Sequence, residues 1–388
     1  MWVRHLRLTD FRSYADVSLD LVPGQVAFVG PNGQGKTNIV EAIAYLATLA
    51  SHRAASDIPL VRQGADRAII AAEVVKDDRS ITIELEINPG KANRARINRG
   101  SPTRAREILG LVQCVVFAPE DLALVKGDPS ERRSFLDELL IQRSPRMQGV
   151  KSDYERIIKQ RNALLKTSAS ARRTAREAML ATMSVWDEQL AAVGGEITAE
   201  RIKALNELLP YTREHYQRIA GGVDAVSDSE MNLRYVPSYE TEISETPRGL
   251  DRDVWAAELE RAITARRDDE FDRGVTLVGP HRDDVAITLG EFPAKGYASH
   301  GESWSLALAL RLASLDVLKA DGDEPILILD DVFAELDAKR RTALVESIPR
   351  DAQVIVTAAV EEDVPPQMTG QRWSIRRGSA QEDEPRGQ

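Results

Sequence analysis

Hydrophobic and polar positions alternate along much of the first 90 residues. A period of two is typical of strands that bury one face. Between two of these stretches, "KTNIVEAIAYLATLA" carries its apolar residues at helical spacing, which predicts a helix over 36–50. The predicted strands are 17–21, 25–30, 67–75 and 80–87, and a further apolar run ends at Phe117.

Helical spacing replaces the alternation after this run. "DPSERRSFLDELL" opens with Asp128 as the N-cap and Pro129 in the first helical position, and leucines three and four residues apart follow. This combination is typical of the start of an amphipathic helix. The spacing predicts helical structure through about residue 218, with interruptions at Gly194–Gly195 and at Pro210.

The last third of the chain returns to strand patterns. A polar, proline-bearing loop is predicted at 237–253, and helices are predicted at 254–274 and 303–320. Residues 378–388 carry no large apolar side chain, so we expect them to be disordered. The predicted strands of this part are 275–279, 285–289, 325–331 and 353–359.

An α/β pattern at both ends of the chain thus encloses a mainly helical block. We predict an α/β fold in which residues 1–126 and 275–388 form one domain. Residues 127–274 would form a second, mainly helical lobe inserted into it.

Composition and charge narrow the class of protein. Of the 388 residues, 43% are hydrophobic and 29% charged, as in globular proteins with a substantial core. No apolar run approaches the roughly 18 residues that span a bilayer, and the N-terminus lacks the apolar core of a signal peptide. Cys114 is the single cysteine, which excludes an internal disulfide and fits a cytoplasmic protein. Because the net charge is −10, a nucleic-acid surface would have to be a local patch.

A glycine-rich turn joins the predicted strand 25–30 to the helix after it. Residues 30–38, "GPNGQGKTN", match the phosphate-binding pattern G-x-x-x-x-G-K-[ST] in its strand–turn–helix context. Backbone N–H groups and the helix dipole of such a turn attract phosphate. We predict that Lys36 reaches the β- and γ-phosphates of ATP and that Thr37 binds Mg²⁺. The other predicted nucleotide-binding residues of the turn are Gly30, Pro31, Asn32, Gly33, Gln34, Gly35 and Asn38.

The stretch "PILILDD" supplies carboxylates for the same site. Its apolar residues predict a buried strand that ends at Asp330 and Asp331. We assign Asp330 to Mg²⁺, directly or through water, and Asp331 to orienting or deprotonating the attacking water. Lys36 and Asp330 come from opposite ends of the chain, an arrangement that disfavours a small-molecule kinase.

Six stretches carry a resemblance along nearly the whole chain. They are "FRSY" (11–14), "GPNGQGKTNIVEAI" (30–43), "FAPEDLALVKGDPSERRSFLD" (117–137), "GPHRDD" (279–284), "SHGES" (299–303) and "ILDDVFAELD" (328–337). In this order they resemble the RecF family of bacterial DNA replication and repair proteins, within the SMC-like branch of the ATP-binding-cassette ATPases.

The resemblance implies a nucleotide site that two copies complete. Ser299 and Gly301 match the signature loop that contacts the γ-phosphate held by a second subunit, and Asp337 matches a segment that crosses the dimer interface. Arg12 matches a residue that contacts the nucleotide; pairing with a surface acid is its alternative role. Glu302 stands where relatives more often carry glutamine.

Further residues receive looser assignments. Glu120, in "APEDL", is the polar candidate for reporting the γ-phosphate to the helical block, and Thr357 is a candidate for positioning water. The charged residues of "GPHRDD" could bind a metal, but a salt-bridged turn is the favoured interpretation.

Two basic stretches, 91–106 and 156–176, are candidates for DNA binding. Lysine and arginine neutralise phosphates without reading sequence. Neither stretch contains an aromatic residue, so duplex backbone is a better match than stacked single-strand bases. A solvated surface is the alternative. The candidates are Lys91, Arg94, Arg96, Arg99, Arg104, Arg106, Arg156, Lys159 and Arg161.

These features predict a weak, DNA-stimulated ATPase whose ATP-driven homodimer clamps duplex DNA at single-strand gaps. The resemblance implies RecR and RecO as partners and the loading of RecA as the purpose. A nucleotide-dependent DNA scaffold with negligible hydrolysis is the alternative, because Asp331 is shorter than the glutamate common in related ATPases. A coiled-coil chromosome protein and a transporter ATPase fit less well.

Overall fold

The computed structural model describes residues 1–51, 53–54, 56–169, 173–220, 231–241, 251–322, 324–349 and 351–383, with the backbone alone at 168–169 and 173–181. The chain forms two compact units. Unit 1 comprises Met1–Leu122, Glu214–Val226 and His300–Gln388. Unit 2 comprises Ala123–Arg213 and Ser227–Ser299.

This division differs from the predicted one, which placed Glu214–Val226 in the helical lobe and ended the first segment of the nucleotide-binding lobe at residue 126 instead of 122. The second boundary differs as well. The prediction placed residues 275–299 with the nucleotide-binding lobe, whereas they lie in unit 2. Strand pairing explains the difference, because β10 (Asp284–Leu289) is hydrogen-bonded to β9 (Met231–Val236) along its whole length. Residues 284–289 therefore belong to the sheet of unit 2.

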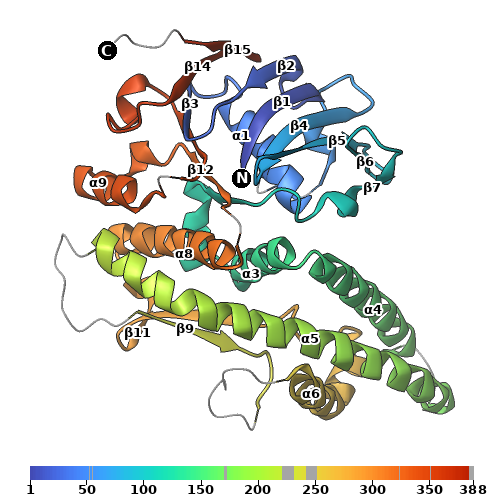
Figure 1. The fold of residues 1–388 in the computed structure, drawn as a ribbon. Helices are drawn as coiled ribbons and strands as arrows, with labels where there is room; N and C mark the ends of the chain where they lie inside the picture. Colours follow the sequence, from blue (N-terminus) through green and yellow to red (C-terminus); the bar gives the residue numbers. More distant parts are fainter. Residues whose placement is uncertain are drawn as a thin grey trace. The chain divides into compact units, whose positions relative to one another are not determined.

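Unit 1 contains an antiparallel sheet built from the first third of the chain (Figure 1). Its alternating burial is the pattern that the sequence predicts for strands with one buried face. In sheet order the strands are β2 (Tyr14–Asp20), β1 (Trp2–Phe11), β4 (Ala68–Lys76), β5 (Arg79–Ile87), β6 (Arg94–Ile97) and β7 (Thr103–Arg104).

The second sheet of unit 1 is largely parallel and brings the two ends of the chain together. In order it contains β15 (Ser379–Glu382), β14 (Gln371–Arg376), β3 (Gln25–Val29), β13 (Val354–Ala358), β12 (Ile326–Asp330) and β8 (Cys114–Phe117). The five strands from β14 to β8 are parallel neighbours, and every residue of β12 and β13 is buried. The carboxyl ends of β3, β13 and β12 therefore meet at one edge.

Helices cover this parallel sheet. α1 (Lys36–Thr48) packs against β8, β12 and β13, and α8 (His300–Ala320) packs against β8. Phe117 and Trp304 meet edge to face, with ring centroids 5.6 Å apart. Cys114 is buried. The other helical elements of unit 1 are η1 (Ile58–Leu60), η2 (Ala105–Ile108), η3 (Pro119–Asp121), η4 (Phe333–Glu335), α9 (Ala338–Ser347), η5 (Glu361–Asp363) and the end of α5.

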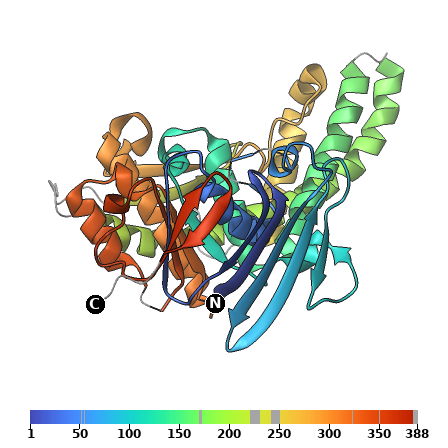
Figure 2. The same ribbon diagram turned by 90° about the horizontal axis from the view of Figure 1, so that it is seen from above.

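Unit 2 is mainly helical, as predicted, with a small antiparallel sheet of order β11 (Phe292–Pro293), β10 and β9. Figures 1 and 2 show the long helices α4 and α5 side by side. Across the described residues, every helix is too short or too polar to cross a bilayer. The helices are α2 (Leu122–Lys126), α3 (Pro129–Arg143), α4 (Arg146–Ala169), α5 (Arg173–Ala220), α6 (Arg252–Arg273) and α7 (Ala294–Tyr297).

The predicted interruptions at Gly194–Gly195 and Pro210 are wrong, because α5 runs through all three positions. The two glycines serve helix packing instead. A Cβ atom on Gly194 would lie 2.5 Å from Leu259, and one on Gly195 would lie 2.4 Å from the backbone nitrogen of Ala256. Both neighbours belong to α6, so the glycines let α6 approach α5 closely.

The predicted strand at 275–279 is also absent. Side chains, not a neighbouring strand, accept the hydrogen bonds of this backbone. The Thr276 N–H donates to Asn162 and the Leu277 N–H donates to the Glu270 carboxylate. The segment is therefore a buried irregular connection with an apolar sequence.

The expected disorder of residues 378–388 is wrong where the structure describes them. Ser379–Glu382 form β15, which pairs with β14 in register with Arg376–Trp373. A tight turn with positive φ at Arg377 and Gly378 joins the two strands. Main-chain pairing forms this polar strand without a buried apolar face; residues 384–388 lie outside the described part.

Candidate nucleotide site

The glycine-rich turn leads from β3 into α1, as predicted. Gly33 and Gly35 have φ values of 77° and 113°, in the left-handed region that side chains disfavour. Gly30 needs space instead, because a Cβ atom there would lie 2.2 Å from the backbone oxygen of Ile375 in β14. Pro31 and Asn32 complete the turn between Gly30 and Gly33.

The Lys36 side chain is buried inside this turn, with 3% of its surface exposed. Its Nζ atom donates to the Gly30 oxygen at 2.7 Å, and to the Pro31 oxygen and Asn32 Oδ1 at 3.4 and 3.3 Å. The nearest carboxylate is that of Asp331, whose Oδ1 is 3.9 Å from Nζ. A buried ammonium thus lies among uncharged acceptors, where an incoming phosphate would be a stronger partner.

The two predicted Mg²⁺ ligands are brought into contact. Thr37 Oγ1 donates to Asp330 Oδ1 at 3.1 Å, and Thr357 Oγ1 donates to the same oxygen at 2.5 Å. Burial raises the pKa of Asp330 to about 6 despite these bonds. A hydroxyl and a carboxylate oxygen suit Mg²⁺, which takes one or two protein ligands and completes its shell with phosphate and water.

Asp331 extends the site from the end of β12. Its φ is 53°, and its N–H donates to Thr357 Oγ1 at 2.9 Å. Thr357 thus touches both aspartates, because β13 lies next to β12 with Asp330 opposite Thr357. The prediction gave Thr357 a role in positioning water, whereas its contacts in the structure position the acids.

Arg12 lies against α1. Its guanidinium forms a bidentate ion pair with the fully buried Glu41, at 2.8 and 2.5 Å. Arg12 therefore pairs with an acid, as the alternative role predicted, but that acid is buried and not on the surface as expected. In the same turn, Ser13 Oγ accepts from Asn38 Nδ2 at 2.9 Å.

Two further contacts hold the phosphate turn, and the sequence did not indicate either. The Tyr14 hydroxyl donates to the Gly35 oxygen at 3.2 Å. The Arg377 N–H donates to Gln34 Oε1 at 2.8 Å, so the β14–β15 hairpin supports the turn from another side. Tyr14 lies within "FRSY", and this motif is the one sequence signal from which the contact could have been found.

The signature segment is supported by Arg340, which the sequence did not single out. A Cβ atom on Gly301 would lie 2.5 Å from Arg340 Nη2, so the guanidinium packs directly on this glycine. Arg340 also donates to Ser305 at 3.2 Å and forms an ion pair with Asp337, the N-cap of α9. Ser299, the last residue of unit 2, is exposed immediately before α8.

Within "APEDL" the structural role belongs to Asp121, not to Glu120. Glu120 is exposed, whereas Asp121 accepts from Arg311 of α8 at 2.6 Å and from the Ala118 N–H at 2.9 Å. Asp121 thus links this loop to α8, the helix that follows the signature loop. The predicted role of Glu120 in reporting the γ-phosphate stays a prediction.

"DPSERR" and "GPHRDD" meet each other inside unit 2. Arg132 forms a bidentate ion pair with Asp284, at 2.7 and 3.0 Å. Arg133 donates to the backbone oxygen of Asp283 at 2.7 Å. Asp283 is fully buried, accepts from Tyr235 at 2.8 Å and has a pKa raised by burial. These contacts support the interpretation of "GPHRDD" as a structural turn.

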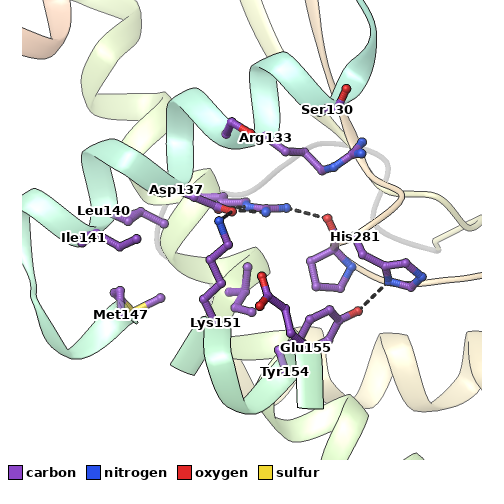
Figure 3. A pocket seen from close by; sticks show the side chains of 14 residues that line it. Ser130, Arg133, Asp137, Leu140, Ile141, Met147, Lys151, Tyr154, Glu155 and His281 are labelled. Carbon is purple, nitrogen blue, oxygen red and sulfur yellow. Dashed lines mark hydrogen bonds and ion pairs between the residues drawn. The ribbon is translucent and has the colours of Figure 1, made fainter. Parts of the chain in front are cut away.

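A cavity of about 220 Å³ lies beside these two segments (Figure 3). Tyr154 is bonded to His281 at 2.8 Å, and burial lowers the pKa of His281 to about 4. Across the cavity, Lys151 forms an ion pair with Asp137 at 3.1 Å. The charged groups thus pair mostly with one another, and among the described residues no cluster of His, Cys, Asp and Glu could hold a metal ion.

The first basic stretch is exposed, with some of its charge balanced. In the pairing register Arg94 and Arg96 lie opposite Glu86 and Glu84, and Arg94 also lies opposite Arg104. Arg96 and Glu84 approach to 3.9 Å. All six candidates of this stretch are exposed, namely Lys91, Arg94, Arg96, Arg99, Arg104 and Arg106.

The candidates of the second basic stretch differ in exposure. Arg156 and Lys159 are exposed on α4, but Arg161 is completely buried and its assignment to DNA is wrong. Its guanidinium bonds to Asp187 at 2.8 Å, Glu270 at 2.5 Å and Thr276 at 2.9 Å. Of the other basic residues in this stretch, Arg172 lies outside the described residues, as do the side chains at 173 and 176.

Comparison with known proteins now places the chain in a family. The model of the "RecF/RecN/SMC N terminal domain" matches residues 2–370. A curated relative from Streptomyces avermitilis, "DNA replication and repair protein RecF", is 56% identical over 382 residues, which cover 98% of this chain and 100% of the relative. The chain belongs to the RecF family. A RecF from Frankia alni is 52% identical and covers 97% of this chain and 98% of its own.

Solved structures agree with this assignment. A structure described as "the recombination mediator protein RecF-ATPrS in RecFOR pathway" is 25% identical, with a TM-score of 0.85 and 98% coverage of both chains. An Smc head bound to a domain of ScpA is 16% identical, with a TM-score of 0.53 and coverage of 99% and 97%. The predicted fold class is confirmed: the chain has the ABC/SMC-type ATPase head fold of the RecF family, with a helical lobe.

Proposed function

We propose that this RecF-family chain is an ATP-driven DNA clamp that acts in replication and repair. One observation carries the proposal: an ammonium, a hydroxyl and two carboxylates from opposite ends of the chain lie together at one edge of a parallel sheet. These groups are Lys36, Thr37, Asp330 and Asp331. The set is what phosphoryl transfer from ATP requires, and the similarity to a DNA replication and repair protein and to a recombination mediator supports the role in DNA repair.

Each residue has a role in this proposal. Lys36 leaves the Gly30 oxygen for the β- and γ-phosphates of ATP. Thr37 and Asp330 would hold Mg²⁺, which neutralises phosphate charge when bound. Asp331 orients the attacking water, and Thr357 keeps the two acids in position.

The terminal phosphate is capped by a second copy. Ser299 and Gly301 supply hydroxyl and N–H donors near the start of α8, where the helix dipole favours an anion, and Asp337 contributes to the interface. Hydrolysis is slow because the donors of one copy cap the nucleotide of the other, so that the site is complete only across the interface. The resulting homodimer holds duplex DNA near a single-strand gap, in the cytoplasm, and assists RecA loading with RecR and RecO; the exposed basic residues of 91–106 and α4 support the DNA contact.

Sedimentation velocity with ATP, with ADP and without nucleotide tests the shared site. We expect association with ATP alone. Lys36→Arg should keep part of the ATP affinity and lose hydrolysis, because the larger planar cation replaces a point charge within the turn. Full turnover by this variant, or full turnover by a monomer carrying Ser299→Ala, would contradict the proposal.

A nucleotide-dependent scaffold with negligible hydrolysis is the second candidate. It is favoured by the short side chain of Asp331, whose carboxylate lies 3.9 Å from the Lys36 ammonium. ATPase assays with and without gapped duplex DNA separate the two functions. A rate that gapped DNA raises supports the enzyme, and DNA-dependent binding without phosphate release supports the scaffold.

A further inference from the structure

Two aromatic side chains near the end of unit 2 are exposed and stacked on each other. Phe292 in β11 is 58% exposed and Tyr297 at the end of α7 is 68% exposed. Their ring centroids are 5.3 Å apart and their planes differ by 27°. Within the described part of the chain, the large apolar side chains that remain exposed include no other aromatic residue. The pair is a flat apolar patch that still faces water.

The backbone around this patch is held in place. β11 pairs with β10, with Phe292 opposite Leu289. Lys295, which lies between these two residues in the sequence, donates from Nζ to the Gly127 backbone oxygen at 2.9 Å and lies 3.6 Å from the Asp128 carboxylate. The patch is therefore presented on a fixed segment, which lowers the entropic cost of covering it.

Its charged surroundings favour a protein over a nucleic acid as the occupant. The Lys295 charge is balanced by Asp128, and Glu291, next to Phe292, is exposed. These charged neighbours of the patch are net negative and would repel DNA phosphates. Aromatic side chains are typical anchors of protein interfaces.

The position of the patch in the chain indicates which protein covers it. Tyr297 precedes Ser299 by two residues, so their Cα atoms are at most about 7 Å apart. Ser299 is exposed as well, so the patch lies close to the start of the signature loop. We propose that the Phe292–Tyr297 patch is a docking surface for a second copy of this chain in the ATP-dependent dimer. The inference rests on the proposed function, in which this loop faces that copy.

The test is sedimentation velocity of the full chain with ATP, with ADP and without nucleotide. The double variant Phe292→Ser with Tyr297→Ser should weaken ATP-dependent association about tenfold or more, because two interface anchors are lost. ATP binding by each copy should be unchanged. The ring-preserving double variant Phe292→Tyr with Tyr297→Phe should associate like the wild type, as should Val185→Ser, a change at another exposed apolar residue of unit 2 (53% exposed).

The outcomes separate the inference from the function on which it rests. Normal association of the serine double variant would overturn the inference and leave the function intact. Loss of duplex binding by that variant, with association unaffected, would assign the patch to DNA and also overturn it. If the wild type fails to associate with ATP, the proposed function itself fails. Should the serine double variant not fold, Tyr297→Glu at this exposed position replaces it with the same expected loss.

Discussion

Buried charges have different partners in the two units. In unit 2, the guanidinium of Arg161 is completely buried and bonds to two carboxylates and a hydroxyl. In unit 1, the nearly inaccessible ammonium of Lys36 bonds to backbone oxygens and an amide oxygen, and among the described residues the only carboxylate that an ion pair joins to it, that of Asp331, is 3.9 Å away. Asp330 is buried beside hydroxyl groups, and its pKa is raised.

This difference separates charges that stabilise the fold from charges that await a ligand. A buried ion pair costs much to break but has little to gain from a third partner. An ammonium on uncharged acceptors gains when an anion arrives. We therefore expect nucleotide to stabilise unit 1 by mass action and to leave the Arg161 network unaffected.

The largest effect is expected in the Arg161 network of unit 2, where the buried charges are paired with one another. Arg161→Met should lower the free energy of unfolding by about 3–5 kcal/mol, because Glu270 stays buried without its cation and Asp187 keeps only its ion pair with Arg267. Arg156→Met on the same helix is the control; its exposed pair with Asp153 should contribute less than about 1 kcal/mol. Denaturant unfolding without nucleotide measures both. Equal stabilities would mean that the network does not support the fold.

The next largest effect is expected at Asp330, the buried carboxylate of the nucleotide site. Burial raises the pKa of Asp330 from 3.8 to about 6. Between about pH 4 and pH 6 the native state binds a proton that the unfolded chain has released, so ligand-free stability falls as pH rises through this window. Asp330→Asn removes this dependence and should be more stable than the wild type by up to about 3 kcal/mol at pH 7.5.

Denaturant midpoints at pH 4 and pH 7.5, without Mg²⁺ or nucleotide, check this expectation. At pH 4 the variant and the wild type should have similar stability, because the native carboxyl is then protonated. A variant that is less stable at pH 7.5 would show that the Asp330 carboxylate stabilises the fold by itself. With Mg-ATP the wild type alone should gain stability.

A smaller effect concerns the signature segment. A methyl group at position 301 would meet Arg340, so Gly301→Ala should displace that guanidinium and weaken ATP-dependent association about fivefold, or about 1 kcal/mol. Gly149→Ala is the matched control, since its Cβ atom would enter open space. Sedimentation with ATP compares them. Equal association would remove Arg340 from the support of the loop.

The smallest effect is expected at the DNA candidates. Arg104→Ala should weaken duplex binding a few-fold and reduce the salt dependence of binding by about one phosphate contact. Arg218→Ala, which removes an exposed arginine paired with Glu214, is the control. Fluorescence anisotropy at several salt concentrations gives both slopes. An unchanged slope for Arg104→Ala would exclude this hairpin from the DNA contact.

Arg161 shows why part of the site could not be predicted. Its charge placed it among the DNA candidates, but on α4 it shares one face with Tyr154, Ile157 and Leu165, all buried. The spacing of three and four residues marks this face in the sequence. The buried partners of Arg161 come from α5, α6 and the segment after α6, and nothing local in the sequence indicates them.

The sequence by itself determined the residues of the phosphate turn, the two acids at the end of β12 and the family. These depend on short-range order: a strand, a tight turn and a helix start within a few residues of one another. The tertiary structure decided that Thr357 touches both acids, that Arg340 packs on Gly301 and that residues 275–299 join unit 2. Strand pairing and charge pairing depend on partners far away in the chain, and a pattern of apolar spacing does not specify which partner is chosen.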